Sequence, residues 1–204
     1  MSFKKKLLNF WYYHKFHTLV GIVAVLALVI GINSCVNRRQ YDVGVLFMTH
    51  GYSDTFYQTE ELINLFDTYA TDSNDDGLSN TQFIVINYGL SLQESNSANA
   101  MRSANLASGK HVLFLIDEQN YSELKNGGFL ADISALGESE YLKEDRFEIY
   151  NSGMLSEISG FKQLDDQYYL CLRTFDKKRA ENDSDYVREY ESAKALFTNI
   201  VNAY

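Results

Sequence analysis

Proline is absent from this chain of 204 residues, and cysteine occurs only twice, as Cys35 and Cys171. The absence of proline excludes rigid proline-rich linkers, and two cysteines are too few for a disulfide framework. Packing must therefore stabilise the fold, and the 15 tyrosines and 13 phenylalanines supply large side chains for a core. The length leaves room for one domain of ordinary size behind a short N-terminal segment.

Acidic residues outnumber basic residues beyond the N-terminal segment. The net charge is −9, yet the first 34 residues carry four lysines and no acidic residue. They therefore contribute +4, and the rest of the chain must carry −13. Such an acidic surface repels phosphate backbones, so we expect no nucleic-acid partner.

A long uncharged stretch lies between Lys15 and Arg38. It has 22 residues, and the part from Leu19 to Ile32 contains only apolar residues and glycine. At about 1.5 Å per residue, a helix over this stretch spans the roughly 30 Å hydrocarbon layer of a bilayer. The lysines before it favour a cytoplasmic N-terminus in the cell membrane. We expect a cytoplasmic head at 1–17, a single-pass transmembrane helix at 18–36 and an extracytoplasmic (extracellular) domain at 37–204.

Cleavage of the same stretch is an alternative. A charged start followed by an apolar run also describes a signal peptide. Residues 32–35 (Ile-Asn-Ser-Cys) resemble a lipoprotein processing site, and Cys35 would then carry the lipid. Whether the stretch is retained or cleaved, the acidic domain is expected to be tethered outside the cell.

Apolar runs and helical periodicity alternate along the acidic part. Short apolar runs bounded by turn residues predict buried strands at 43–48, 83–86, 111–116 and 168–172. Spacing of apolar residues and capping signals predict helices at about 56–69, 92–108 and 185–202, and a short helical turn from 121. This alternation is typical of β-α-β units. The predicted fold class is α/β, as one small three-layer domain with a mostly parallel sheet of about four strands.

One part of this pattern resembles a known family. A helix end with glycine and a strand that ends in aspartate (106–117) precede an Asn-Tyr-Ser-Glu-Leu turn (120–124) and a Gly-Phe-Leu-Ala-Asp-Ile segment (128–133). This succession resembles the first lobe of bacterial extracellular solute-binding proteins, the capture components of ABC importers. Residues 168–173 are similar to the strand with which the chain of those proteins returns to the first lobe. The resemblance implies half of a periplasmic-binding-protein-like fold.

The resemblance also implies a function, but this chain differs from the family in one respect. Family members have two lobes that close on a ligand, and here the chain ends where the second lobe would be inserted. A single lobe cannot enclose a small molecule by hinge closure. We therefore expect a non-enzymatic binding or sensing module that works beside a membrane partner such as a permease, or as a homo-oligomer. A lipoprotein solute-binding component modified at Cys35 is the alternative.

Polar residues follow the three predicted parallel strands. In α/β folds, the loops at the carboxyl ends of parallel strands gather at one edge, where ligands usually bind. This position makes the following residues candidate ligand-binding residues: Thr49, His50, Tyr52, Asn87, Tyr88, Asp117, Gln119 and Asn120.

The segment 72–77 (Asp-Ser-Asn-Asp-Asp-Gly) matches the opening of a calcium loop. Oxygen ligands would come from the side chains of Asp72, Asn74 and Asp76 and from the Leu78 carbonyl. Position 12 of the loop is Phe83 in place of the bidentate glutamate of an EF-hand, so any calcium site would be partial. A solvated turn is the alternative, because Asn, Asp and Gly favour turns. No other cofactor is expected.

An enzyme is the rival hypothesis. Residues 45–52 resemble the strand and His-Gly turn near the oxyanion hole of α/β-hydrolases. That family needs a Gly-x-Ser-x-Gly elbow and a histidine that comes last in chain order. The segment around Ser91 lacks the second glycine, and no histidine follows His111. We therefore expect no enzymatic activity. Cys171 lies in an apolar run and is expected to be an inert buried thiol.

Overall fold

The structure is a computed structural model that describes residues 3–36, 41–50, 59–88, 91–158, 161 and 167–204. In the first of these ranges, the side chains of 3, 5–10, 14 and 31–36 are not described. The chain divides into two compact units, Met1–Gln40 and Tyr41–Tyr204. Each unit is described by itself.

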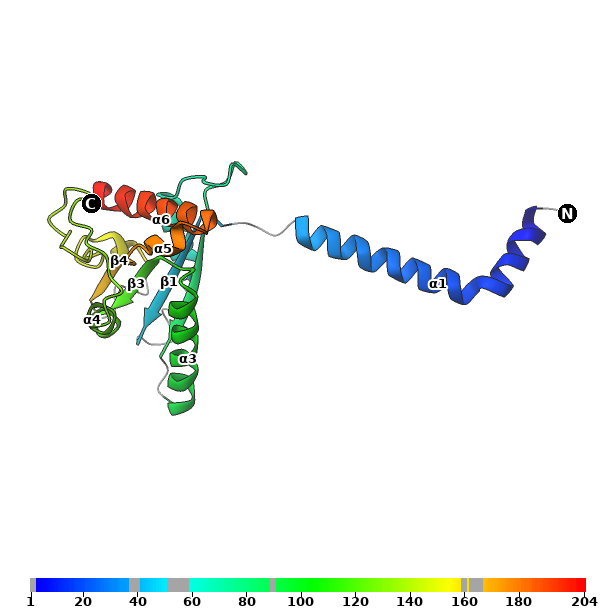
Figure 1. The fold of residues 1–204 in the computed structure, drawn as a ribbon, viewed down its shortest axis with the longest axis horizontal. Helices are drawn as coiled ribbons and strands as arrows, with labels where there is room; N and C mark the ends of the chain where they lie inside the picture. Colours follow the sequence, from blue (N-terminus) through cyan, green and yellow to red (C-terminus); the bar gives the residue numbers. More distant parts are fainter. Residues whose placement is uncertain (1–2, 37–40, 51–58, 89–90, 159–160, 162–166) are drawn as a thin grey trace. The chain divides into compact units, whose positions relative to one another are not determined.

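The first unit is one helix, α1 (Phe3–Val36) (Figure 1). It confirms a helical conformation at 18–36, but the same helix also covers most of the predicted head. Its apolar side chains from Leu19 to Ile30 are exposed. In the part of the chain that the structure describes, no helix reaches the length and apolarity that a membrane span requires. The predicted transmembrane span therefore gains no support from the structure.

The second unit is built on a sheet of four strands with the order β2-β1-β3-β4. The strands are β1 (Val43–Thr49), β2 (Thr81–Asn87), β3 (Leu113–Asp117) and β4 (Tyr168–Leu172). Strand β1 pairs in parallel with β2 and β3, and β4 pairs with β3 in the antiparallel direction. The predicted mostly parallel sheet of about four strands is confirmed.

Helices cover both faces of this sheet (Figure 1). Helices α2 (Thr59–Asp67) and α6 (Ser184–Ala203) pack on one face, and α3 (Leu92–Ser108) and α4 (Glu118–Asn126) pack on the other. The short helices η2 (Met154–Glu157) and α5 (Lys177–Ala180) lie in the connections. Successive side chains of β1 point to opposite faces, so Phe47 enters one core and Met48 the other. The domain is therefore a three-layer α/β domain.

Local signals explain where several elements begin and end. Ser91 and Glu94 form the predicted capping box at the start of α3, and Gly109 ends that helix with a left-handed φ of 60°. Asp117 ends β3 and also caps α4, because its side chain accepts a hydrogen bond from the Asn120 N–H. The predicted helix at 56–69 is found as α2 from Thr59, and its predicted first turn falls outside the described residues.

Candidate functional site

The carboxyl ends of the three parallel strands place several predicted residues together. In the register of the sheet, Thr49 pairs with Asn87, so the next residues, His50 and Tyr88, leave neighbouring strands side by side. Strand β3 ends at Asp117, and β4 begins opposite it at Tyr168. The hydroxyl groups of Thr49 and Tyr168 are 2.7 Å apart and join β1 to β4 across this edge.

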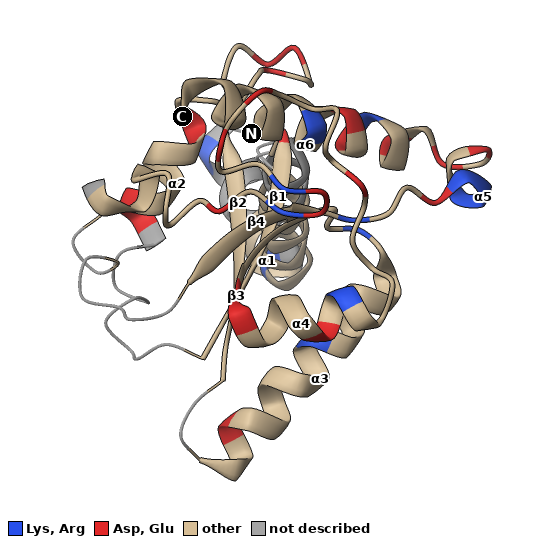
Figure 2. Cartoon of the chain, turned by 90° about the vertical axis from the view of Figure 1, so that its left-hand side faces the viewer, with Lys and Arg blue, Asp and Glu red and all other residues tan. Residues whose placement is uncertain are grey.

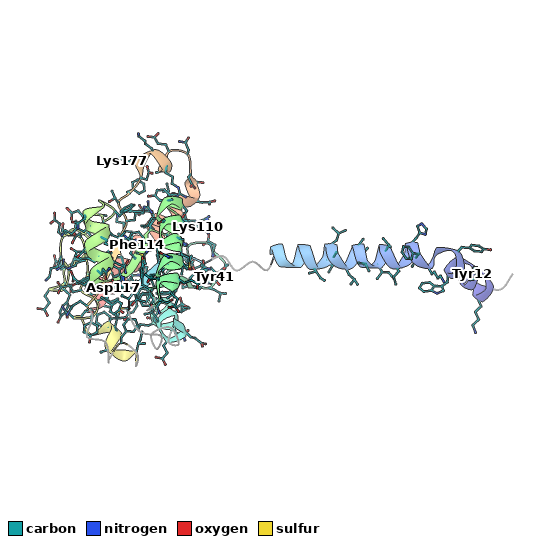
Figure 3. The ribbon with its side chains drawn as sticks, turned by 90° about the horizontal axis from the view of Figure 1, so that it is seen from below. Tyr12, Tyr41, Lys110, Phe114, Asp117 and Lys177 are labelled. Carbon is teal, nitrogen blue, oxygen red and sulfur yellow. The ribbon has the colours of Figure 1, made fainter. Side chains whose placement is uncertain are left out.

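Asp117 is the centre of the hydrogen bonds at this edge (labelled in Figure 3). Its side chain is buried, and Oδ2 accepts a hydrogen bond from the His50 N–H (2.6 Å) and lies 2.8 Å from His50 Nδ1. Oδ1 accepts from the backbone N–H and from Nδ2 of Asn120, both at 2.9 Å. A carboxylate oxygen accepts, so Nδ1 of His50 is the donor in this contact, and Nε2 is the ring nitrogen that Asp117 does not engage.

The His50 ring stacks on Tyr88, with 4.3 Å between the ring centroids and 12° between the planes. Burial raises the pKa of the Tyr88 hydroxyl, and the nearby Arg102 guanidinium partly opposes this rise. Arg102 on α3 forms an ion pair with Glu123 on α4. The hydrogen bond from Arg102 lowers the pKa of Glu123 and keeps it ionised. Stacking and ion pairing thus connect the ends of β1 and β2 to α3 and α4.

We call this arrangement the polar cluster. Its members are His50, Tyr88, Arg102, Asp117, Asn120 and Glu123. Gln119 lies beside it and donates a hydrogen bond to Glu123.

Two amide oxygens at this edge are buried without a donor. Asn120 is fully buried, and its Oδ1 has no hydrogen-bond partner in the described part of the protein. The same is true of Oδ1 of Asn87 at the end of β2. A buried polar atom without a partner costs about 1–3 kcal/mol, and native proteins retain few of them. These two acceptors are therefore candidates for contact with a ligand.

A pocket of about 480 Å³ lies between the end of β2 and the first half of α3. Its polar lining consists of Asn87, Ser91, Gln93, Glu94 and Ser97. Its apolar lining consists of Ile86, Ala98 and Met101. The volume is in the range of pockets that bind small molecules. The pocket adjoins the polar cluster through chain neighbours, because Asn87 precedes Tyr88 and Met101 precedes Arg102.

The structure thus brings four of the predicted residues into direct contact, namely His50, Tyr88, Asp117 and Asn120. Thr49 and Gln119 lie beside them, and Asn87 lines the pocket. Tyr52 lies outside the described residues. Sequence reasoning missed Arg102, Glu123 and the α3 side of the pocket. The binding role of the residues that the sequence indicated stays a prediction.

The predicted calcium loop is a closed turn at the opposite edge of the sheet. Asp72 accepts hydrogen bonds from the backbone N–H groups of Asn74, Asp76 and Gly77. The side chains of Asn74 and Asp76 accept from the Asp76 and Leu78 N–H groups. Among the described residues, no group of three or more His, Cys, Asp or Glu side chains is arranged to hold a metal ion. Calcium binding at Asp72, Asn74, Asp76 and Leu78 stays a prediction in which only two of the four ligands are carboxylates.

Ser91, Cys171 and His111 carry reactive groups, and each lies in surroundings that limit its chemistry. Ser91 donates its hydroxyl hydrogen bond to Glu94 within the helix cap, so its described partner is a carboxylate and not a histidine. Burial raises the pKa of Cys171 well above its usual value and makes it a poor nucleophile. Burial also lowers the pKa of His111 to about 4, so this side chain is neutral at pH 7. Cys35 belongs to α1, and its side chain is not among those described.

Comparison with known proteins identifies no relative whose function could be considered for this site. Searches against protein-family models, curated proteins and solved structures found no match. The resemblance of 106–133 and 168–173 to solute-binding proteins therefore stays a prediction that depends on those residues alone.

Proposed function

We propose that this chain is a non-enzymatic binding or sensing module, tethered to the outer surface of the cell membrane by its N-terminal helix. The domain corresponds to one lobe of a solute-binding protein and acts with a membrane partner such as a permease, or with a second copy of itself. Its ligand site is the polar cluster together with the adjoining pocket. No cofactor is part of this proposal, and calcium is proposed only for the loop at 72–78.

Two buried amide oxygens without a described donor, both at the carboxyl edge of the sheet, are the observation that carries the proposal. Asn87 and Asn120 each leave Oδ1 buried and without a partner in the described residues, at the edge where α/β domains usually bind ligands. The neighbouring carboxylate of Asp117 is, by contrast, saturated with donors. A fold that satisfies Asp117 and leaves two acceptors at the same edge without a described donor is better suited to receive a ligand than to seal its core.

Sequence features support the membrane tether. The uncharged stretch of 22 residues continues beyond Ile30, the last α1 residue with a described side chain. The apolar side chains of α1 are exposed along its described length, and such a surface requires a cover. A bilayer is the cover that suits a helix that is apolar on all sides. Retention of this helix and lipidation of Cys35 after cleavage remain the two possible forms of the tether.

Extraction and crosslinking in native membranes test the tether and the partner. We expect the full chain to stay with membranes in alkaline carbonate, and the acidic domain to be digested by protease added outside intact cells. Zero-length crosslinking is expected to join the domain to a membrane protein or to a second copy. Release by carbonate would contradict the tether, and a monomer without neighbours would contradict the partner. Mass spectrometry of the N-terminus decides between a retained helix and a lipid on Cys35.

The Asp117–His50 pair favours a second candidate function. A carboxylate that holds Nδ1 of a histidine and leaves Nε2 free is the arrangement of a general base. A hydrolase also needs a nucleophile, and Ser91 is engaged by Glu94. We therefore expect no turnover of p-nitrophenyl acetate above the background rate of the variant His50→Gln. Turnover that disappears in this variant would favour the enzyme.

A further inference from the structure

The two lateral strands of the sheet differ in how the described part of the chain covers them. Strand β4 is covered, because Phe147 lies beside it and exchanges backbone hydrogen bonds of 2.8 and 2.9 Å with Leu170. Strand β2 pairs with β1 on its inner side, and no described strand pairs with its outer side. Within the described residues, the outer side of β2 is therefore open.

The backbone groups of β2 alternate between its two sides. The Tyr88 N–H donates to a carbonyl of β1, so the even-numbered residues of β2 turn their backbone groups toward β1. The odd-numbered residues turn theirs outward, and the Thr81 N–H accordingly donates to the Asp67 side chain and not to β1. The N–H and C=O groups of Phe83 and Val85 thus point away from the sheet, and they form no hydrogen bond with the described residues.

Strand β2 has none of the features that usually protect an open lateral strand. Its seven residues contain no charged side chain and no proline. Its pairing with β1 runs residue by residue from Thr81 to Asn87, without a bulge. Proteins usually block such strands with lysine, proline or a bulge, because unpaired N–H and C=O groups recruit another strand. An uncharged apolar strand of this kind needs a cover that prevents open-ended association.

The surface on the α3 side of β2 also carries little charge. Helix α3 packs against β2 and has two charged residues among 17, Glu94 and Arg102, of which Arg102 forms an ion pair with Glu123. Figure 2 shows β2 without charged residues and α3 with few. The chain beyond residue 34 carries −13, so two copies repel each other through most of their surface. No charge on β2 opposes a contact there, and interface centres are depleted of charged residues.

Strand β2 is complementary to itself in the antiparallel direction. A two-fold axis through Ile84 places Phe83 of one copy opposite Val85 of the other, and both residues turn their backbone groups outward. Each such pair exchanges N–H···O=C bonds in both directions, whereas Ile84 meets Ile84 as a pair without hydrogen bonds and with close side chains. These three side chains are half-buried in the single chain, so pairing covers apolar surface that is still exposed. A two-fold contact closes on itself and leaves no open side of β2.

On these grounds we propose that the outer side of β2 is the contact between two copies of this chain, joined by antiparallel β2–β2 pairing about Ile84 into one continuous sheet. This proposal rests on the proposed function, in which a second copy is one of the two partners, and it adds the surface and the register of the contact. In the joined sheet, α3 of one copy lies on the same face as α3 of the other.

Cysteine substitutions in the full chain test the contact and its register. Ile84→Cys brings two thiols opposite each other, where a Cα–Cα distance of about 4.5 Å permits a disulfide. Gln82→Cys is the matched control, because it lies on the same face of the same strand but its two copies are about 13 Å apart along the strand. Native membranes are oxidised with copper phenanthroline and analysed by non-reducing electrophoresis. We expect roughly tenfold more covalent dimer from Ile84→Cys than from Gln82→Cys or the unmodified chain, whose Cys35 and Cys171 give the background.

Proline at position 85 tests the contact without a crosslink. Val85 turns its N–H outward, so Val85→Pro removes a hydrogen bond to the second copy and retains those between β2 and β1. Light scattering in a non-ionic detergent is expected to give the mass of a dimer for the unmodified chain and of a monomer for Val85→Pro. Circular dichroism verifies that the variant is folded. Added salt is expected to strengthen the dimer of the unmodified chain, because it screens the repulsion between two acidic copies.

Several outcomes would overturn the proposal. Equal yields of covalent dimer from Ile84→Cys and Gln82→Cys, a monomeric unmodified chain, or an unchanged dimer of folded Val85→Pro would each reject the β2 contact. A disulfide from residue 84 to a different protein would reject a second copy as the partner at this strand. If Ile84→Cys or Val85→Pro fails to fold, the other variant decides alone. Carbonate extraction and crosslinking to a permease do not depend on β2, so failure of this contact leaves the tether and the membrane partner to be judged separately.

Discussion

The polar side chains at the two edges of the sheet differ in their hydrogen bonding. At the amino edge, where β1 and β2 begin, Asp42 accepts hydrogen bonds from the Ser73 N–H, the Ser73 hydroxyl and the Asn80 N–H. Asp67 accepts two from Thr81. At the carboxyl edge, Asp117 is equally saturated, but the amide oxygens of Asn87 and Asn120 are left without donors among the described residues.

This difference shows that the number of carboxylates at an edge of the sheet does not determine whether that edge can bind a ligand. The amino edge is richer in carboxylates, yet these are occupied by backbone N–H groups and hold the connection from α2 to β2 in place. Exceptions at this edge are Asn80 Oδ1, His111 Nδ1 and Arg173 Nη1, which are buried and have no partner among the described residues. The carboxyl edge has fewer acids but combines unpaired acceptors with a pocket. Neither the local density of charge nor the number of unpaired groups therefore distinguishes the carboxyl edge, whereas the pocket at the end of β2 does.

Replacing Asp117 is expected to have the largest effect on stability. The variant Asp117→Ala leaves the donors of His50 and Asn120 without their buried acceptor and removes the cap of α4. We expect a loss of about 3 kcal/mol in the free energy of unfolding, measured by urea denaturation. Asp132→Ala is the control, because Asp132 is exposed and, among the described residues, accepts hydrogen bonds from Ser134 alone. Equal losses in the two variants would show that Asp117 does not organise the carboxyl edge.

Replacing Asp42 tests the other edge. Asp42 is buried, and Asp42→Ala removes the acceptor of three hydrogen bonds to the loop at 73–80. We expect a loss of about 2 kcal/mol in the free energy of unfolding by the same urea measurement. A loss larger than that of Asp117→Ala would contradict the expected order of the two edges.

Acid sensitivity is expected to come from the amino edge. His111 precedes β3, and burial lowers its pKa from 6.5 to about 4 in the folded state, with a smaller effect from Lys110. Its surroundings include Gly44 on β1 and Glu189 on α6, whose own pKa is raised by burial. Below pH 6.5 the unfolded chain binds the proton that the folded chain refuses, so stability falls as the pH decreases toward 4.

Urea denaturation at pH 7.5 and pH 5 measures this acid sensitivity. We expect His111 to account for about 1–2 kcal/mol of lost stability between these values, after allowance for partial solvent screening. The variant His111→Gln has no titrating ring and is expected to lose correspondingly less between the two pH values. An equal loss in both proteins would assign the acid sensitivity to other groups.

The sequence predicted the strand topology that forms the site more fully than the helical residues that line it. Apolar runs located β1, β2 and β3, and the parallel arrangement then placed His50, Tyr88 and Asp117 at one edge. The stack of His50 on Tyr88 depends on the pairing of Thr49 with Asn87, a register that no local pattern specifies. The direction of β4 likewise follows from its pairing with β3 and not from its composition.

The residues that α3 contributes to the site could not be predicted from the sequence. Helix α3 is mostly polar, and only Ala98 and Leu106 are buried on it, so its apolar periodicity is weak. Arg102 and Glu123 belong to different helices and meet only through packing on the sheet. Small residues such as Ser97 and Ala98 leave the space that forms the pocket, and a helical pattern of small residues does not indicate a cavity.

Calcium is expected to have the smallest effect and tests the amino edge most directly. The side chains of Asp72, Asn74 and Asp76 already accept backbone N–H groups, so a cation must use their remaining lone pairs and the Leu78 carbonyl. With a dissociation constant in the millimolar range, 10 mM calcium would raise the free energy of unfolding by about 1 kcal/mol relative to excess chelator. Asp76→Ala is expected to remove this increase. No increase in the unmodified chain would show that the loop is a turn and that its side-chain oxygens serve the backbone N–H groups and not a cation.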